Sequence, residues 1–107
     1  MARIAYKALL RNTILSVHGV NARWLTVTHV QETDHDQIVW QGEVETFELM
    51  KHSQAKYCYA WSIEINDLTV VLTALKIPPV SSPQTAIHLA YTEGKLDLKR
   101  HLLQNFK

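Results

Sequence analysis

The sequence predicts one α+β domain over residues 1–107, in which a four-stranded antiparallel meander sheet carries a C-terminal helix or helix pair and a short N-terminal helix. Three observations predict this class. A composition of 47 % apolar and 20 % charged residues in 107 positions suits a single globular core. In the middle of the chain apolar and polar residues alternate with a period of two, and at both ends the apolar residues have helical spacing.

The strongest local pattern is a hairpin over residues 56–77. Apolar and aromatic side chains occupy every second position from Tyr57 to Ile65, and a second β-rich run begins at Leu68. Only Asn66-Asp67 separates the two runs, and both residues tolerate the positive φ of a two-residue turn. Such a turn places Ile65 opposite Leu68, with the register continuing in steps of one residue on each strand.

This register gives the hairpin two different faces. The face with Tyr57, Tyr59 and Trp61 is aromatic, and we expect it to meet the core. The reverse face carries Cys58 and Ala60 and is smaller and mixed. It either faces water or admits a closely packed helix or partner.

Two further strands are predicted upstream, over residues 24–30 and 38–49. The wholly polar segment 31–36 between them is predicted to be an exposed loop. In the second strand the apolar positions change phase after Thr46, which predicts a bulge or bend near Gly42 or Thr46.

Helices are predicted at both ends of the chain, against one face of the sheet. Ser82-Pro83 is typical of a helix start, and Gly94 is a plausible stop, so residues 83–107 form one bent helix or two short ones. Before Ser82, residues 77–80 are predicted to be an extended, stiff connector. At the other end residues 2–10 are predicted to be helical, whereas residues 12–20 could form either helix or strand.

The sequence contains no established catalytic or metal-binding motif. Glu32 and Asp34-His35-Asp36 offer metal donors, but they lack the spacing of a calcium or zinc site, so no metal or cofactor is predicted. Cys58 follows His52 by six positions, but its small neighbours favour packing over nucleophilic catalysis. Catalytic residues are therefore unknown, and whether the protein is an enzyme stays open.

Charge and hydropathy argue against nucleic acid and membranes as partners. Residues 1–30 carry four basic and no acidic side chains, and residues 31–49 carry six acidic and no basic ones, but the net charge is only +1. This balance does not favour nucleic-acid binding despite the basic stripe Arg3, Lys7 and Arg11. No apolar run is long enough to span a membrane. The single Cys58 and the early basic residues predict a cytoplasmic protein.

The aromatic residues suggest an interaction surface. Tyr and Trp concentrate where apolar surface meets water, so we expect a ligand or partner surface at His52, Tyr57, Tyr59 and Trp61. The leading hypothesis is a non-enzymatic interaction module that self-associates through its sheet as a homodimer or higher homo-oligomer. The alternative is a small-molecule-binding protein or minor enzyme with a pocket between the sheet and the C-terminal helices.

About 40 residues of the chain resemble a set of small uncharacterised bacterial proteins of the mobile gene-cassette type. The resemblance lies in residues 42–45, 47–49, His52, 55–56, 59–61, 77–80 and 82–83. Ser53 departs from the proline that follows the histidine in that set. The resemblance implies a bacterial cytoplasmic origin and draws attention to His52, Tyr59 and Trp61, but it implies no activity.

Overall fold

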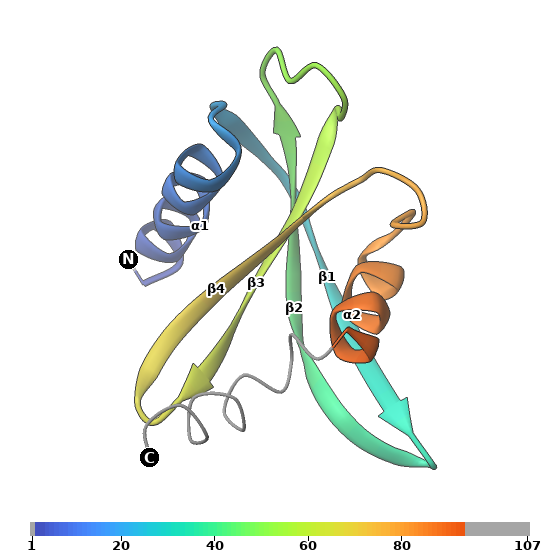
Figure 1. The fold of residues 1–107 in the computed structure, drawn as a ribbon. Coiled ribbons are helices and arrows are strands. Elements are labelled where there is room, and N and C mark those ends of the chain that lie inside the picture. Colours follow the sequence, from blue (N-terminus) through green and yellow to red (C-terminus); the bar gives the residue numbers. More distant parts are fainter. Residues whose placement is uncertain (1, 94–107) are drawn as a thin grey trace, which may run out of the picture.

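The structure is a computed structural model that describes residues 2–93. Its elements, in chain order, are α1 (Ala2–His18), β1 (Ala22–Asp34), β2 (Gln37–Leu49), β3 (Tyr57–Ile65), β4 (Leu68–Leu75) and α2 (Pro83–Thr92). The strands form one antiparallel sheet in the order β1-β2-β3-β4 (Figure 1), so the predicted α+β meander is confirmed. The predicted stop at Gly94 and any helix after it lie outside the described residues.

The β3–β4 hairpin has the predicted turn and register. Asn66 and Asp67 have φ angles of 51° and 68°, as a tight two-residue turn requires. Ile65 lies opposite Leu68 and Trp61 opposite Leu72. The backbone N–H of Lys76 donates to the carbonyl of Tyr57 at 2.9 Å and extends the pairing by one residue.

The β1–β2 connection is a second tight hairpin, and the predicted loop over residues 31–36 is wrong. The strands continue to Asp34 and from Gln37, and His35-Asp36 forms the turn with φ angles of 53° and 65°. Polar side chains are compatible with strand here because the tip of the hairpin is mostly exposed and its backbone groups pair across the ladder.

The N-terminal helix is longer than the segment for which helix was predicted. It extends from Ala2 to His18, so residues 12–18 are helical. It ends at Gly19, which adopts a φ of 75° and donates its N–H to the carbonyl of Leu15 at 2.9 Å.

The two helices cover opposite faces of the sheet, so the expectation that both lie against one face is wrong. Leu10 and Ile14 of α1 pack with Cys58 and Ala60, on the small-residue face. Helix α2 packs instead on the aromatic face, which carries Tyr59 and Trp61 (Figure 1). Small side chains on β3 leave room for the apolar stripe of α1 to approach closely, which creates a second core.

The two cores also explain the change of phase in β2. Val44 belongs to the core under α2, and Phe47 belongs to the core under α1. Opposite faces of β2 are therefore both buried, and β2 itself has no extra residue at Gly42 or Thr46. One register shift does lie next to Thr46, but its extra residue is Leu25 of the neighbouring strand β1. The other shift leaves Val39 of β2 without an opposite residue.

Helix α2 begins as predicted. Ser82 caps it by accepting a hydrogen bond from the N–H of Thr85, whose hydroxyl accepts from the N–H of Ser82 in return. The connector before it makes a turn, with the N–H of Val80 donating to the carbonyl of Ile77 at 2.9 Å, and is not fully extended as predicted. Among the described residues, no helix is long and apolar enough to cross a membrane.

Candidate functional site

Two of the four residues predicted to form an interaction surface lie near the β2–β3 end of the molecule. Nδ1 of His52 accepts the backbone N–H groups of Gln54 and Ala55, each at 3.0 Å, and so holds the loop between the strands. Tyr57 is half-buried and has two ammonium groups near its ring, with Nζ of Lys56 and of Lys76 at 5.6 and 5.5 Å from the ring centroid.

The other two residues are in the core. Tyr59 and Trp61 are 3 % and 1 % exposed and pack beneath α2. Burial raises the pKa of the Tyr59 hydroxyl above its usual range. The four predicted residues therefore do not share one outer surface, and Trp61 borders a cavity.

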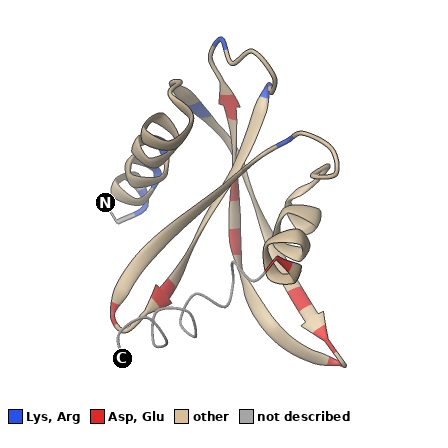
Figure 2. Cartoon of the chain, viewed as in Figure 1, with Lys and Arg blue, Asp and Glu red and all other residues tan. Residues whose placement is uncertain are grey.

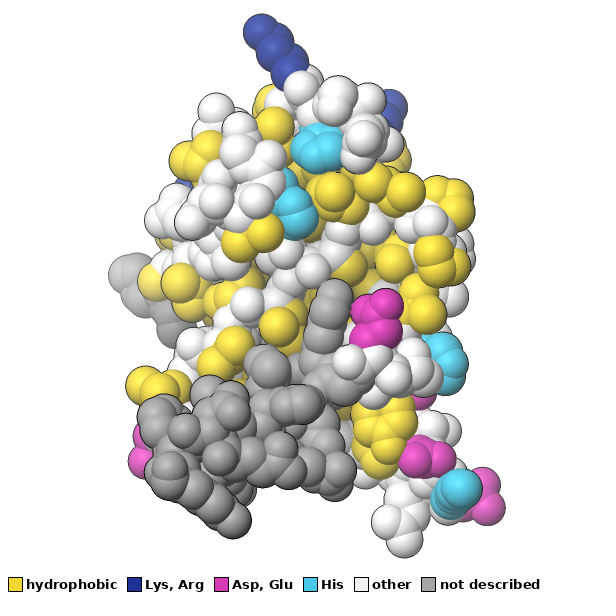
Figure 3. Space-filling view, in the orientation of Figure 1, with side chains coloured by type: hydrophobic (Ala, Val, Ile, Leu, Met, Phe, Trp, Pro, Cys, Tyr) yellow, Lys and Arg dark blue, Asp and Glu magenta, His cyan; other side chains and the backbone are white. Residues whose placement is uncertain are grey.

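A cavity of about 130 Å³ lies between α2 and the β3–β4 hairpin. Trp61 and Leu72 border it from the sheet, Val80 from the connector, and Ala86 and Leu89 from the helix. In the view of Figure 3, hydrophobic side chains gather over the connector that leads into α2. The polar residues at its border are Thr73 and Glu93.

The indole of Trp61 has an unusual environment. Its Nε1–H is buried and has no hydrogen-bond partner within the described part of the chain. By contrast, Nε1 of Trp24 donates to Oε1 of Glu45 at 2.7 Å. A buried donor without an acceptor is unfavourable by about 1–3 kcal/mol.

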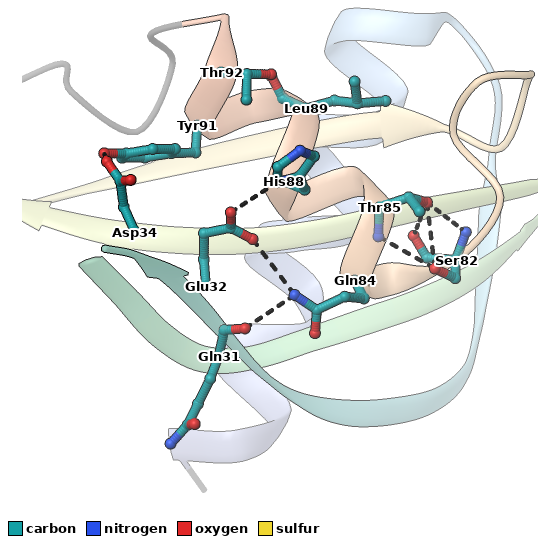
Figure 4. Close-up of polar contacts among 10 residues, drawn as sticks. All are labelled: Gln31, Glu32, Asp34, Ser82, Gln84, Thr85, His88, Leu89, Tyr91 and Thr92. Carbon is teal, nitrogen blue, oxygen red and sulfur yellow. Dashed lines mark hydrogen bonds and ion pairs between the residues drawn. The ribbon is translucent and has the colours of Figure 1, made fainter. Parts of the chain in front are cut away.

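A polar cluster ties α2 to the end of β1 (Figure 4). Glu32 is 4 % exposed, and Nδ1 of His88 lies 2.8 Å from its Oε2. Nε2 of Gln84 donates to Oε1 of the same carboxylate at 3.4 Å and to the carbonyl oxygen of Gln31 at 2.9 Å. The hydroxyl of Tyr91 donates to Oδ2 of Asp34 at 2.8 Å. These contacts fix the position of α2 over the sheet.

Sequence reasoning missed this cluster. Glu32 and His88 are 56 positions apart, and no local spacing relates them. The available signal was the alternation of β1, which places Val30 and Glu32 on the same face of the strand once that strand is extended beyond Val30.

The middle of β1 is the least covered part of the sheet. Residues 25–29 are exposed in succession, whereas Ala22 is buried in the core under α1 and Val30 in the core under α2. Leu25 and Val27 are each 37 % exposed. As β1 is an edge strand, its outer backbone groups are also unpaired within the sheet.

Comparison with known proteins gives no information about these features. The chain matches no protein-family model, no curated protein and no solved structure. Function must therefore be inferred from the side chains and their arrangement.

Cys58 does not have the environment of a nucleophile. It is fully buried, and its Sγ donates to the carbonyl of Tyr59 at 3.6 Å. Burial raises the pKa of the Cys58 thiol to about 12, so the reactive thiolate is scarce at neutral pH. His52, the base considered for it, uses Nδ1 to hold its own loop.

Metal binding has no support from the geometry. The part of the chain that the structure describes holds no group of three or more His, Cys, Asp or Glu side chains arranged around a common point. His35 lies 3.6 Å from a carboxylate oxygen of Asp34, but this pair is at the exposed tip of the hairpin.

Proposed function

We propose that the protein is a non-enzymatic interaction module that self-associates through the outer edge of β1. The supporting observation is the exposed middle of β1, residues 25–29, which neither helix covers. Helices occupy both faces of the sheet, so the faces are less available for a partner than the edge. As the resemblance and the lone Cys58 suggest, we place this module in the bacterial cytoplasm.

A second copy of the same chain suits this edge. An edge strand presents a row of free N–H and C=O groups, which another strand can pair with directly. Two β1 strands related by a twofold axis would pair antiparallel, with the same patch used on both copies. The register shifts at Leu25 and between Glu32 and Thr33 leave residues 26–32 as the regular part of the edge.

Charge favours the antiparallel arrangement. Each β1 has Arg23 near its beginning and Asp34 at its end. Figure 2 shows basic residues along α1 and at the start of β1, and acidic residues toward the tip of the β1–β2 hairpin. Antiparallel pairing turns the basic part of each copy toward the acidic part of the other, which steers their association.

Sedimentation equilibrium at micromolar concentration tests the proposal. The protein should sediment with twice its chain mass of 12.3 kDa. A charge at the centre of the edge, Val27→Lys, should shift it to the monomer. Val17→Lys, which replaces another exposed valine on α1, is the matched control and should leave the dimer intact. A wild-type monomer at 100 micromolar would refute the proposal.

A second candidate function is binding of a small molecule. The cavity between α2 and the β3–β4 hairpin favours it, because this is where the alternative hypothesis expects a pocket. A ligand that binds only the folded protein raises its melting temperature. A thermal-shift screen of small molecules should therefore find stabilising compounds, and filling the cavity with Ala90→Leu should remove their effect.

A further inference from the structure

We infer that the C-terminal segment, residues 95–107, packs as an amphipathic helix on the β3–β4 end of the aromatic face of its own sheet. This end of the face carries Ile63, Val70 and Leu72, which lie on the same side of the hairpin as Trp61. The inference is independent of the proposed self-association, because that uses β1 at the opposite edge of the sheet.

Helix α2 does not reach over this end of the face. Among the strands it packs mainly along β1, where its His88 contacts Glu32 (Figure 1). Ile63, Val70 and Leu72 accordingly remain only half-buried. An apolar part of the sheet is thus left with little cover from the helices that the structure describes.

The last residue of β3 indicates that something further covers this end. Ile65 lies on the same face, next to the turn, and is 3 % exposed. Neither core cluster of the described residues includes it, and Leu68, directly opposite, is 67 % exposed. The burial of Ile65 is therefore best explained by a part of the chain other than α1 and α2.

The described chain ends where such a cover would begin. Glu93 borders the same cavity as Leu72. The 13 residues that follow Gly94 would span about 20 Å as a helix, at 1.5 Å per residue. The path along β4 from Leu72 to Leu68 is roughly 14 Å, so the segment is long enough to cover this end of the face.

The segment has the side chains that this surface requires. Leu98, Leu102 and Phe106 recur every four residues, which places them on one side of a helix. The segment carries four basic residues and one acidic residue. The β3–β4 turn is acidic, with Glu64 and Asp67 (Figure 2), so opposite charges favour docking at this end.

A nitroxide label on the full chain tests this placement. Gln104→Cys puts the label on the polar side of the segment, and Cys58 should stay unlabelled because it is buried and its thiol pKa is raised to about 12. The label should remove most of the intensity of the amide signals of Ile63 and Val70. The signal of Lys51, in the loop at the other end of the molecule, should keep its intensity (Figure 1).

Two further substitutions in the labelled chain test the apolar side of the segment. Leu102→Asp places a charge against the apolar face, so it should release the segment and restore both amide signals. His101→Asp adds the same side chain at the neighbouring position, on the polar side, and should leave the loss of intensity unchanged. Equal effects of the two substitutions would show that the apolar side makes no contact and would overturn the inference.

A mixed sample identifies the chain that supplies the segment. It combines nitroxide-labelled protein without ¹⁵N and ¹⁵N-labelled protein without nitroxide, and the signals of Ile63 and Val70 should then keep their intensity. The proposed dimer places its two β3–β4 hairpins at the outer edges, so pairing through β1 does not alter this expectation. Loss of intensity in the mixture would mean that a second copy supplies the segment. Full intensity in the labelled chain itself would mean that the segment lies elsewhere, and either result overturns the inference.

Discussion

Nη2 of Arg3 lies 2.7 Å from Oε1 of Glu45, a carboxylate that is fully buried under α1 and 42 positions away in the sequence. The same oxygen accepts a hydrogen bond from Trp24 at 2.7 Å, and Nζ of Lys7 lies 3.4 Å from the centroid of that indole. The basic residues in the first turns of α1 therefore offset the negative charge of Glu45, which β2 places in the core.

Arg3→Ala should destabilise the protein by about 1–3 kcal/mol, since it leaves a buried carboxylate oxygen with one donor fewer and no cation in contact. Urea unfolding at neutral pH measures this loss. Arg11→Ala removes an exposed arginine from the same helix and should change the free energy of unfolding by less than about 0.5 kcal/mol. Equal effects of the two substitutions would contradict a specific role for the Arg3–Glu45 pair.

Gly42→Ala should be unfavourable because the ring of Trp40 occupies the space next to it. A Cβ atom at position 42 would lie 2.9 Å from Cζ2 and 3.1 Å from Cη2 of Trp40, so the ring must move. We expect a loss of about 1–3 kcal/mol, as for other overpacked sites, together with a shift in tryptophan fluorescence. In a Trp40→Leu background the same substitution should have little effect, and a double-mutant cycle measures that coupling.

Stability should fall in mild acid partly because of His18. Burial lowers the pKa of His18, the charge of His52 adds to the lowering, and Nε2 of His18 lies 2.8 Å from Oγ1 of Thr73. The folded state therefore favours the neutral ring, and the unfolded chain binds more protons between the folded pKa and the ordinary value of 6.5. The contribution of His18 is complete above pH 6.5 and is lost as the pH falls toward the folded pKa.

Urea unfolding between pH 7.5 and pH 5 checks this dependence. His18→Gln keeps a hydrogen-bonding side chain but does not titrate, so stability should fall less steeply with acid in this variant than in wild type. His35→Gln removes a histidine whose side chain is 82 % exposed and should leave the pH dependence unchanged. If stability fell with acid as steeply in His18→Gln as in wild type, other groups would account for the acid sensitivity.

Asp67→Gly should stabilise the β3–β4 hairpin. Asp67 has a φ of 68°, a conformation that glycine adopts without steric strain, and Asn-Gly is a strongly favoured pair in this type of turn. The greater freedom of glycine in the unfolded chain offsets part of this relief, so the expected net gain is below about 1 kcal/mol, visible as a higher melting temperature. Asp67→Val, with a branched Cβ at the same angle, should lower the melting temperature; a rise would mean that the turn is not as described.

Much of the fold could be read from local patterns. The alternation of residues 57–65 and 68–75, with two turn-forming residues between them, determines both the hairpin and its register. Ser82-Pro83 determines the start of α2, because the cap and the ring of proline act on the nearest backbone groups. Such signals are local, so they need no knowledge of the rest of the chain.

The residues that make up the candidate sites could not be predicted from local patterns in this way. The sequence placed Tyr59 and Trp61 both on the face that meets the core and at a possible partner surface, and only the packing of α2 over them shows that they are buried. The pair Glu32–His88 depends on the same packing. Likewise, α1 could have joined the same face as α2, and only its packing against Cys58 and Ala60 shows otherwise.

The sequence by itself determined the class, the order of the strands and the hairpin register, because these follow from side-chain periodicity and turn chemistry over a few residues. Tertiary structure alone decided which helix covers which face, which aromatic rings are buried, and where an edge and a cavity remain. Those features depend on the space left when distant segments pack together, and that space is a property of the whole assembly of elements and not of any short segment.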